Sequence, residues 1–238
     1  LCMIYCKEVT KITKQEWKDG GILGIFLFLL FALLTVGLQY TIPSINAFLT
    51  SLSAVIVPFL LWGIFHIRPD KTCFLAIALT VIGVALLSGT SHMEGNIGMI
   101  LSLGASVAFA FQMVWMDRFL QKDNALHLAL VEHMVVLLCA FMVTLLQNVP
   151  LPPITLSALY YFFILGAFCT ATYFVLQSLG QKITKPFNAA LILTSESVFA
   201  SITAAILYGE RLSFREYIGC ATIFFAVLLA EKKQTATE

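Results

Sequence analysis

Charged residues are scarce in this sequence and are absent from two long stretches. Only 11% of its 238 residues are Asp, Glu, Lys or Arg, whereas a soluble domain carries about 25%. No such residue occurs from Gly20 to Phe65 or from His133 to Gln181. Each stretch is long enough for two membrane helices of about 20 residues. The composition therefore excludes an ordinary soluble domain and indicates a protein that crosses a membrane several times.

The sequence also lacks the patterns of several other protein classes. Its apolar stretches are continuous and do not alternate with polar residues, which excludes a membrane β-barrel and leaves helices as the spanning elements. The six cysteines show no CxxC or Cys/His spacing, so we expect neither a disulfide framework nor a metal site. Without a glycine-rich phosphate loop, neither ATP nor another cofactor is expected. The net charge of +1 gives no sign of nucleic-acid binding.

Prolines, glycines and charged residues divide the apolar sequence into spans. Eight spans are predicted, over 20–42, 45–65, 70–89, 95–117, 125–147, 156–180, 187–208 and 213–231. The segment Leu1–Cys6 is too short to cross a membrane, and we interpret it as the end of a further span. Pro58 predicts a kink in its span, because it cannot donate a backbone hydrogen bond. The predicted fold is an all-α, polytopic helical bundle.

Basic residues set the predicted orientation. When Lys7–Lys18 is placed in the cytoplasm, all of the 14 Lys and Arg residues except Arg211 and Arg215 lie on the cytoplasmic side. Membrane proteins follow this positive-inside bias, and the reverse topology would invert it. We therefore predict a multi-pass protein of the plasma membrane with both ends of this chain in the cytoplasm.

A weak internal repeat relates the two halves of the sequence. A shift of 142 residues places Gln39–Gly89 over Gln181–Glu231 without a gap, with nine identities in 51 positions, Asn46 and Asn188 among them. The shift covers five spans, an odd number, so the two copies would cross the membrane in opposite directions. Inverted repeats of this kind are typical of secondary transporters, which bind substrate near the bilayer midplane.

These segments resemble a known family. "NAFLTSLSAVIVPFLLW" resembles the fourth span of drug/metabolite transporters of the EamA type, and "LQSLGQKI" and "SESVFASITAAILYGERLSFREYIGCATIFFAVLL" resemble their eighth to tenth spans. The resemblance implies a ten-helix fold of two five-helix inverted repeats and export of amino acids or related small metabolites. It assigns 1–94 to the first repeat, without its first span and most of its second, and 95–238 to the second repeat. Ser197 departs from the proline that commonly follows the family's glutamate.

One carboxylate, Glu196, stands alone within an apolar span. A charge at the bilayer centre costs about 3 kcal/mol on insertion scales, so such a group normally faces a bundle interior or a water-filled cavity. Two interpretations stay open: Glu196 contacts a substrate amine or carries a proton, or it is protonated or hydrogen-bonded and holds helices together. The polar residues expected beside it in a central substrate cavity, from their helical spacing or the repeat, are Gln39, Asn46, Thr50, Tyr173, Gln177, Gln181, Asn188 and Ser195.

A second pair of titratable residues lies near the predicted cytoplasmic side. Glu132 and His133 would form a proton relay, or an interfacial pair whose charged ends reach toward water.

Three functions stay open for the whole chain. A secondary transporter fits the inverted repeat. A membrane enzyme would need more converging His, Asp, Glu or Cys residues, so no enzyme is expected. The third possibility is a membrane protein that has no transport activity in this form, because its first repeat is incomplete. The expected partners are a small-molecule substrate, the lipid bilayer and a second copy in a homodimer.

Overall fold

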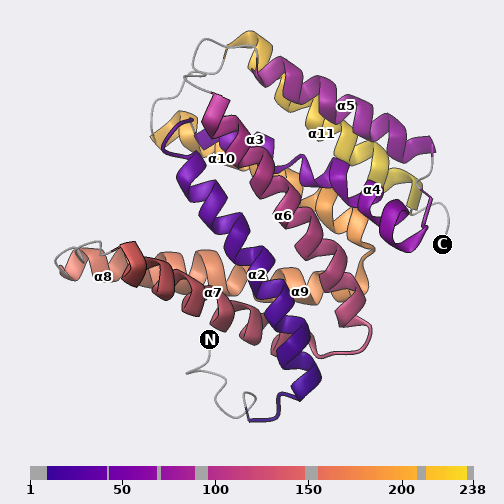
Figure 1. The fold of residues 1–238 in the computed structure, drawn as a ribbon. Coiled ribbons are helices and arrows are strands. Elements are labelled where there is room, and N and C mark those ends of the chain that lie inside the picture. The colour runs from indigo at the N-terminus through magenta and orange to yellow at the C-terminus, as the bar shows by residue number, and fades with distance from the viewer. Residues whose placement is uncertain are drawn as a thin grey trace. The chain divides into compact units, whose positions relative to one another are not determined.

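In the computed structural model the described residues form helices joined by turns and short irregular segments. The structure describes residues 10–41, 43–68, 71–88, 96–147, 155–207 and 213–234, and these contain helices and turns but no strand. Helices occupy all of the predicted spans (Figure 1), in the order α2 (Lys14–Gly37), α3 (Pro43–Thr50), α4 (Ser53–Phe65), α5 (Lys71–Ser88), α6 (Asn96–Leu120), α7 (Ala125–Gln147), α8 (Leu156–Phe163), the π-helix η1 (Ile164–Thr172), α9 (Tyr173–Ile183), α10 (Pro186–Leu207) and α11 (Phe214–Gln234). The predicted further span at Leu1–Cys6 lies outside the described residues.

Several of these helices have the length and composition of membrane spans. Within the described residues five are long and apolar enough to cross a membrane: Lys14–Gly37, Ile45–Phe65, Ile97–Leu120, Ala125–Gln147 and Leu156–Ile183. Two shorter apolar helices run over Phe74–Gly83 and Tyr217–Ala226. The prediction of an all-α, polytopic membrane protein is confirmed.

The helix α2 begins at Lys14, earlier than the span predicted from Gly20. Thr13 and Glu16 form a capping box: the Glu16 amide donates to the Thr13 hydroxyl at 3.2 Å, and the Thr13 amide donates to the Glu16 carboxylate at 2.8 Å. Charged residues mark the edge of the hydrocarbon core but do not end a helix, so α2 extends beyond its apolar part.

The chain forms two compact units. The first comprises residues 1–28 and 115–184, and the second comprises 29–114 and 185–238. The sequence of α2 is divided between them at Phe28, and that of α6 at Val114. Each unit therefore contains parts of both predicted repeats.

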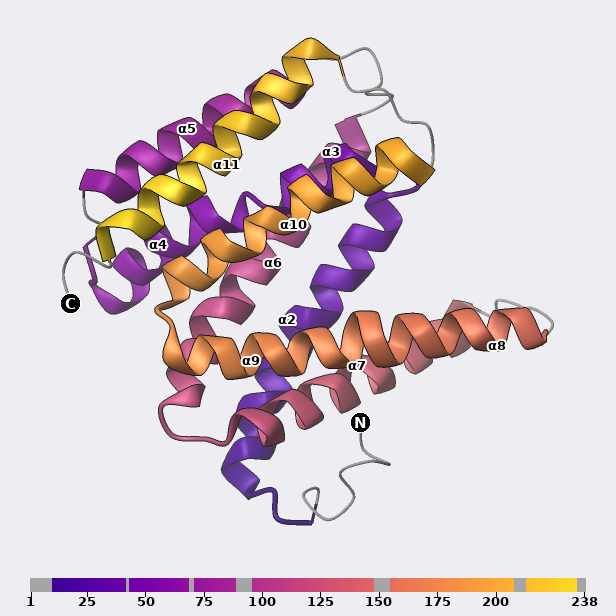
Figure 2. The same cartoon turned by 180° about the vertical axis from the view of Figure 1, so that it is seen from behind.

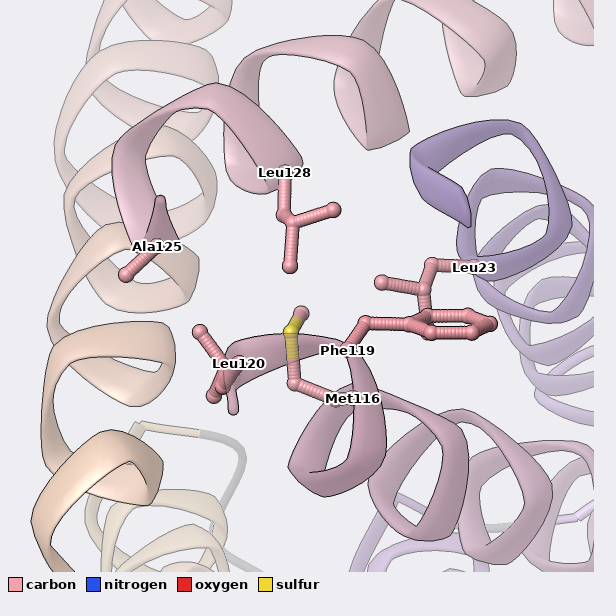
Figure 3. Packing of buried hydrophobic residues seen from close by; sticks show 6 residues of the cluster. All are labelled: Leu23, Met116, Phe119, Leu120, Ala125 and Leu128. Atoms are coloured by element: carbon pink, nitrogen blue, oxygen red, sulfur yellow. The ribbon is translucent and has the colours of Figure 1, made fainter. Parts of the chain in front are cut away.

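The first unit is centred on an apolar cluster. Figure 3 shows Leu128 of α7 pointing at Met116 of α6, while Leu23 of α2 lies over the ring of Phe119. All of the cluster's side chains are buried: Leu23, Met116, Phe119, Leu120, Ala125 and Leu128. Because α2, the end of α6 and the start of α7 all contribute to it, the cluster fixes the positions of these three segments within the first unit.

Glycines bring α2 and α7 into close contact in the first unit. A Cβ at Gly20 would lie 2.7 Å from the Val131 Cβ, and one at Gly24 would lie 2.5 Å from the Val135 Cβ. Their spacing is the small-xxx-small pattern through which membrane helices approach closely. The helix α7 also packs along α9, and both views show the two side by side (Figures 1 and 2).

Helices that are equivalent in the predicted repeat pair with each other in the second unit. The helices α5 and α11 lie side by side in opposite directions, and α10 runs antiparallel along α3 and α4 (Figures 1 and 2). A Cβ at Gly83 of α5 would lie 2.9 Å from the Gly219 carbonyl oxygen and 2.5 Å from Ile223. The members of each pair run in opposite directions, and opposite directions are what the predicted inverted repeat calls for.

Candidate substrate cavity

The second unit contains a cavity of about 230 Å³ bordered by residues of α2, α3, α4, α6 and α10 and of the turns after α2 and α3. Most of the lining is apolar, with polar groups on α3, on α4, in the turn between them and at one point of α10. The lining residues are Leu34, Leu38, Pro43, Asn46, Ala47, Thr50, Ser51, Ser53, Phe109, Ala190, Leu193 and Glu196.

Asn46 lines this cavity and also ties three helices together. Its amide nitrogen donates to the Leu34 carbonyl of α2 at 3.1 Å, and its amide oxygen accepts from the Ser102 hydroxyl of α6 at 2.5 Å. Gly37 allows this approach, because a Cβ there would lie 3.3 Å from the Ser102 hydroxyl. Hydrogen bonds of this kind hold helices together in membranes. The predicted cavity residue Asn46 is thus also a structural contact.

The span that carries Asn46 is broken beside the cavity. The helix stops at Thr50 and resumes at Ser53, and within the break the Leu52 amide donates to Leu49 at 3.2 Å in a tightened turn. The Ser51 hydroxyl donates to the Phe48 carbonyl at 2.6 Å, a side-chain bond that competes with regular helix. Sequence analysis predicted an irregularity at Pro58. The helix α4 runs through Pro58, and the interruption at Ser51 and Leu52 comes before it.

Glu196 lines the same cavity as the residues of this break. It projects from α10 on the same stripe as Ala190 and Leu193, at intervals of three residues. Within the described part of the chain the Glu196 side chain is exposed, as expected of a carboxylate at an open cavity. Asn46, Thr50 and Glu196 are the predicted site residues that this cavity brings together.

Three other predicted site residues of the second unit do not line the cavity. Asn188 is half-buried on α10, and the Ser195 hydroxyl donates to the Ile192 carbonyl of its own helix at 2.6 Å. Gln39 is exposed in the turn that follows α2. Helical spacing placed Asn188 and Ser195 on a face with Glu196, but the face of α10 that meets the cavity is turned toward Ala190 and Leu193.

The remaining predicted cavity residues belong to α9 in the first unit. Tyr173 is half-buried, with its ring edge-on to Phe174 at a centroid distance of 4.8 Å. Gln177 and Gln181 are buried at 8% and 3% exposure. Within the described residues the Gln181 amide has no hydrogen-bond partner on either its oxygen or its nitrogen.

The predicted relay pair lies on α7 in the first unit. Glu132 is fully buried, at 0% exposure. His133 uses its Nδ1 for the Ala129 carbonyl at 2.8 Å and packs edge-on against Phe174. A proton on Nδ1 is required for that bond. Among the described residues His133 has no hydrogen bond to Glu132, and the proton relay stays a prediction.

Sequence analysis missed a polar cluster in the first unit. The Glu16 carboxylate accepts from the Asn124 amide at 3.3 Å and lies 2.8 Å from the His127 Nδ1. Asp19 is buried one turn further along α2. The capping box was the one local signal for Glu16. The cluster joins the start of α2 to the turn between α6 and α7, which are more than 100 residues apart in sequence.

Asp123, in the turn between α6 and α7, belongs to the same cluster. Its burial, its hydrogen bond with Asp19 and the negative charges of Asp19 and Glu16 together raise the pKa of Asp123, although Lys122 partly opposes them. Neighbouring negative charge disfavours the ionised form of a carboxyl group, so Asp123 keeps its proton to a higher pH than an isolated aspartate. Within the described residues no group of three or more His, Cys, Asp or Glu side chains could hold a metal ion.

The helices and the cavity define a polytopic α-helical membrane protein, and comparison with known proteins identifies its family. The profile of the EamA-like transporter family matches residues 1–89 and 96–231. The chain therefore belongs to the EamA-like transporter family and is a membrane transporter. The resemblance noted in the sequence is confirmed.

A curated relative and a solved structure agree with this assignment. An uncharacterized transporter from Archaeoglobus fulgidus is 28% identical over 214 residues, which cover 90% of this chain and 68% of the relative. A crystal structure of a protein superposes with a TM-score of 0.72 over 97% of this chain and 80% of that one. At 17% identity, this second likeness shows the fold alone.

Proposed function

We propose that the chain is a secondary transporter that exports small metabolites, such as amino acids or related compounds, by alternating access around a central cavity. The observation that carries the proposal is the cavity of the second unit, whose lining includes both Glu196 and residues beside a helix break. Discontinuous helices near the membrane centre form the substrate sites of many secondary transporters, because their interrupted backbone offers polar groups inside the bilayer.

Glu196 is the residue that we propose to contact the substrate or carry a coupling proton. Its equivalent position in the first predicted repeat is Ala54, so the fold itself does not require an acid there. An acid within an apolar span is costly in a membrane, and such groups normally face a bundle interior or a water-filled cavity, which favours a functional reason for Glu196. We further propose that the protein works in the plasma membrane with both ends of this chain in the cytoplasm, and as a homodimer.

The test is flux through proteoliposomes. A thermal-shift screen would identify substrates. Their flux would then be measured with the unmodified chain and with Glu196→Gln, which keeps the shape of the side chain and removes its charge. We expect Glu196→Gln to lose most of the flux while its melting temperature stays nearly unchanged.

Ser195→Ala is the matched control, because Ser195 is the neighbouring residue on α10, does not line the cavity and bonds its own helix. It should keep normal flux. Full flux and an unchanged pH profile in Glu196→Gln would contradict the proposal.

A further inference from the structure

Two hydroxyl groups of the cavity wall, those of Thr50 and Ser51, donate their hydrogen bonds to backbone carbonyls. The Thr50 hydroxyl donates to the Asn46 carbonyl at 2.8 Å, and the Ser51 hydroxyl donates to the Phe48 carbonyl at 2.6 Å. A hydroxyl has one proton and two lone pairs. Toward the cavity, these two oxygens can therefore only accept hydrogen bonds.

The backbone at the helix break also offers few donors. The Ala54 amide donates to Ser51 at 3.1 Å, and the Val55 and Ile56 amides donate to Leu52 at 2.9 and 3.1 Å. An anion site at the start of a helix uses such amides when they are free. Here they are bonded within the turn, so the start of α4 does not present a row of free amides to a negatively charged group.

The charge of the cavity lining also favours a ligand that donates hydrogen bonds. Glu196 is the one acidic residue in the lining, and no Lys, Arg or His is among the described residues around the cavity. The Ser53 hydroxyl makes no hydrogen bond with the described residues and can donate or accept. The remaining wall is apolar, from Leu34 and Phe109 to Leu193. A ligand that matches this lining carries hydrogen-bond donors and a positive charge at one end and an apolar body at the other.

The size of the cavity limits that body. A cavity of about 150 Å³ holds benzene, and this one is about 230 Å³. It can therefore receive one aromatic ring, or an aliphatic group of similar size, together with a short arm that ends in an ammonium group.

We propose that the cavity selects protonated amines with a compact apolar body and no carboxylate. This inference rests on the proposed function and narrows it, because an amino acid would bring its carboxylate close to Glu196 and to the Thr50 and Ser51 oxygens, which can only accept. The ammonium group would donate to the Glu196 carboxylate and to the Thr50 and Ser51 oxygens, and the body would lie against the apolar wall.

Three probes of the same size test the proposal. Phenethylamine, L-phenylalanine and 2-phenylethanol share the phenylethyl body, and they differ in carrying an amine, an amine with a carboxylate, and a neutral hydroxyl. Apparent Kd values would be measured by thermal shift on the purified 238-residue chain. We expect phenethylamine to bind at least about tenfold more tightly than either of the others, the scale of one charge-assisted hydrogen bond.

Variants identify the groups responsible. Glu196→Gln should weaken phenethylamine about tenfold or more and leave 2-phenylethanol unchanged. Thr50→Val, which keeps the shape of the side chain, should weaken phenethylamine by a smaller factor and so tests the proposal even if Glu196→Gln does not fold. Asp117→Asn removes a carboxylate from α6 that does not line the cavity, and it should leave all three affinities unchanged.

The outcomes separate this inference from transport itself. The inference is overturned if L-phenylalanine binds as tightly as phenethylamine, if none of the three probes binds, or if phenethylamine binding survives both Glu196→Gln and Thr50→Val. Flux of L-phenylalanine that depends on Glu196, without a preference for the amine, would leave the transporter proposal standing and refute the selectivity. Selective amine binding without any flux would support the selectivity and refute transport by this chain.

Discussion

The helix α2 takes part in two kinds of packing, one in each unit. In the first unit Gly20 and Gly24 bring it so close to α7 that no Cβ fits between them. In the second unit Leu34, of the same helix, borders a cavity of about 230 Å³. The first region gains stability from contact, and the second leaves volume for a ligand beside a carboxylate. Changes at the close contact in the first should therefore lower stability most, and a change of the cavity carboxylate in the second should alter binding and flux.

The largest loss of stability is expected from Gly24→Ala in the first unit. The new Cβ would lie 2.5 Å from the Val135 Cβ and 2.8 Å from the Glu132 carbonyl oxygen, so α2 and α7 must move apart. Overpacking of this kind costs about 1–3 kcal/mol. The measurement is the free energy of unfolding in detergent.

Gly21→Ala is the matched control for Gly24→Ala. A Cβ at Gly21 would meet nothing within 4 Å, and alanine favours helix over glycine by up to about 1 kcal/mol. Gly21→Ala should therefore be neutral or slightly stabilising. Equal losses in the two variants would refute close glycine packing as the basis of the first unit.

An intermediate effect is expected from Asn46→Ala in the second unit. The change removes the hydrogen bonds to Leu34 and Ser102. Since an interhelical hydrogen bond in a membrane contributes about 0.6 kcal/mol on average, we expect a loss of roughly 1 kcal/mol. A double-mutant cycle with Ser102→Ala measures the coupling directly. Strictly additive losses would show that the Asn46–Ser102 contact does not stabilise the unit.

The smallest effect concerns pH and Asp123. Burial and the neighbouring carboxylates raise the pKa of Asp123 in the folded chain, so folding favours its protonated form. Its stabilising contribution is complete below the unfolded pKa of about 3.9 and is lost as the pH rises through the raised folded pKa. The melting temperature of the unmodified chain should fall over that range relative to Asp123→Asn, by no more than about 2 °C.

The partner carboxylate gives a check on that result. Asp19→Asn should flatten the pH curve in the same way, because Asp19 contributes to the raised pKa of Asp123. If the melting temperature of Asp19→Asn changes with pH as that of the unmodified chain does, Asp19 does not raise the pKa of Asp123.

Much of the fold was predictable because spans leave a strong mark in the sequence. A stretch without charges, such as Gly20–Phe65, has to be helical in a bilayer, and every predicted span contains helix. Helix ends were less predictable, because hydropathy shows which residues lie in the membrane and does not show where the helical backbone begins or ends. The break at Ser51 lies in an apolar run where the local signal is one side-chain hydrogen bond to the backbone, whereas the proline of this span, Pro58, lies within α4.

The site was only partly predictable, for reasons of geometry. Glu196 could be singled out because an isolated carboxylate in an apolar span is rare and costly. Its neighbours could not, because a rotation of α10 by about one residue decides whether Ser195 faces the cavity together with Glu196. The cluster of Glu16 with Asn124 and His127 joins residues distant in sequence, and a single sequence does not reveal such contacts.

The central claim is that the cavity of the second unit carries function and that the close contact of α2 with α7 in the first unit carries stability. The most direct measurement is flux per folded molecule in proteoliposomes, compared between Glu196→Gln and Gly24→Ala. The account predicts that Glu196→Gln melts like the unmodified chain and has flux near background, whereas Gly24→Ala melts earlier and keeps its flux per folded molecule. Normal flux in Glu196→Gln, together with lost flux in folded Gly24→Ala, would contradict it.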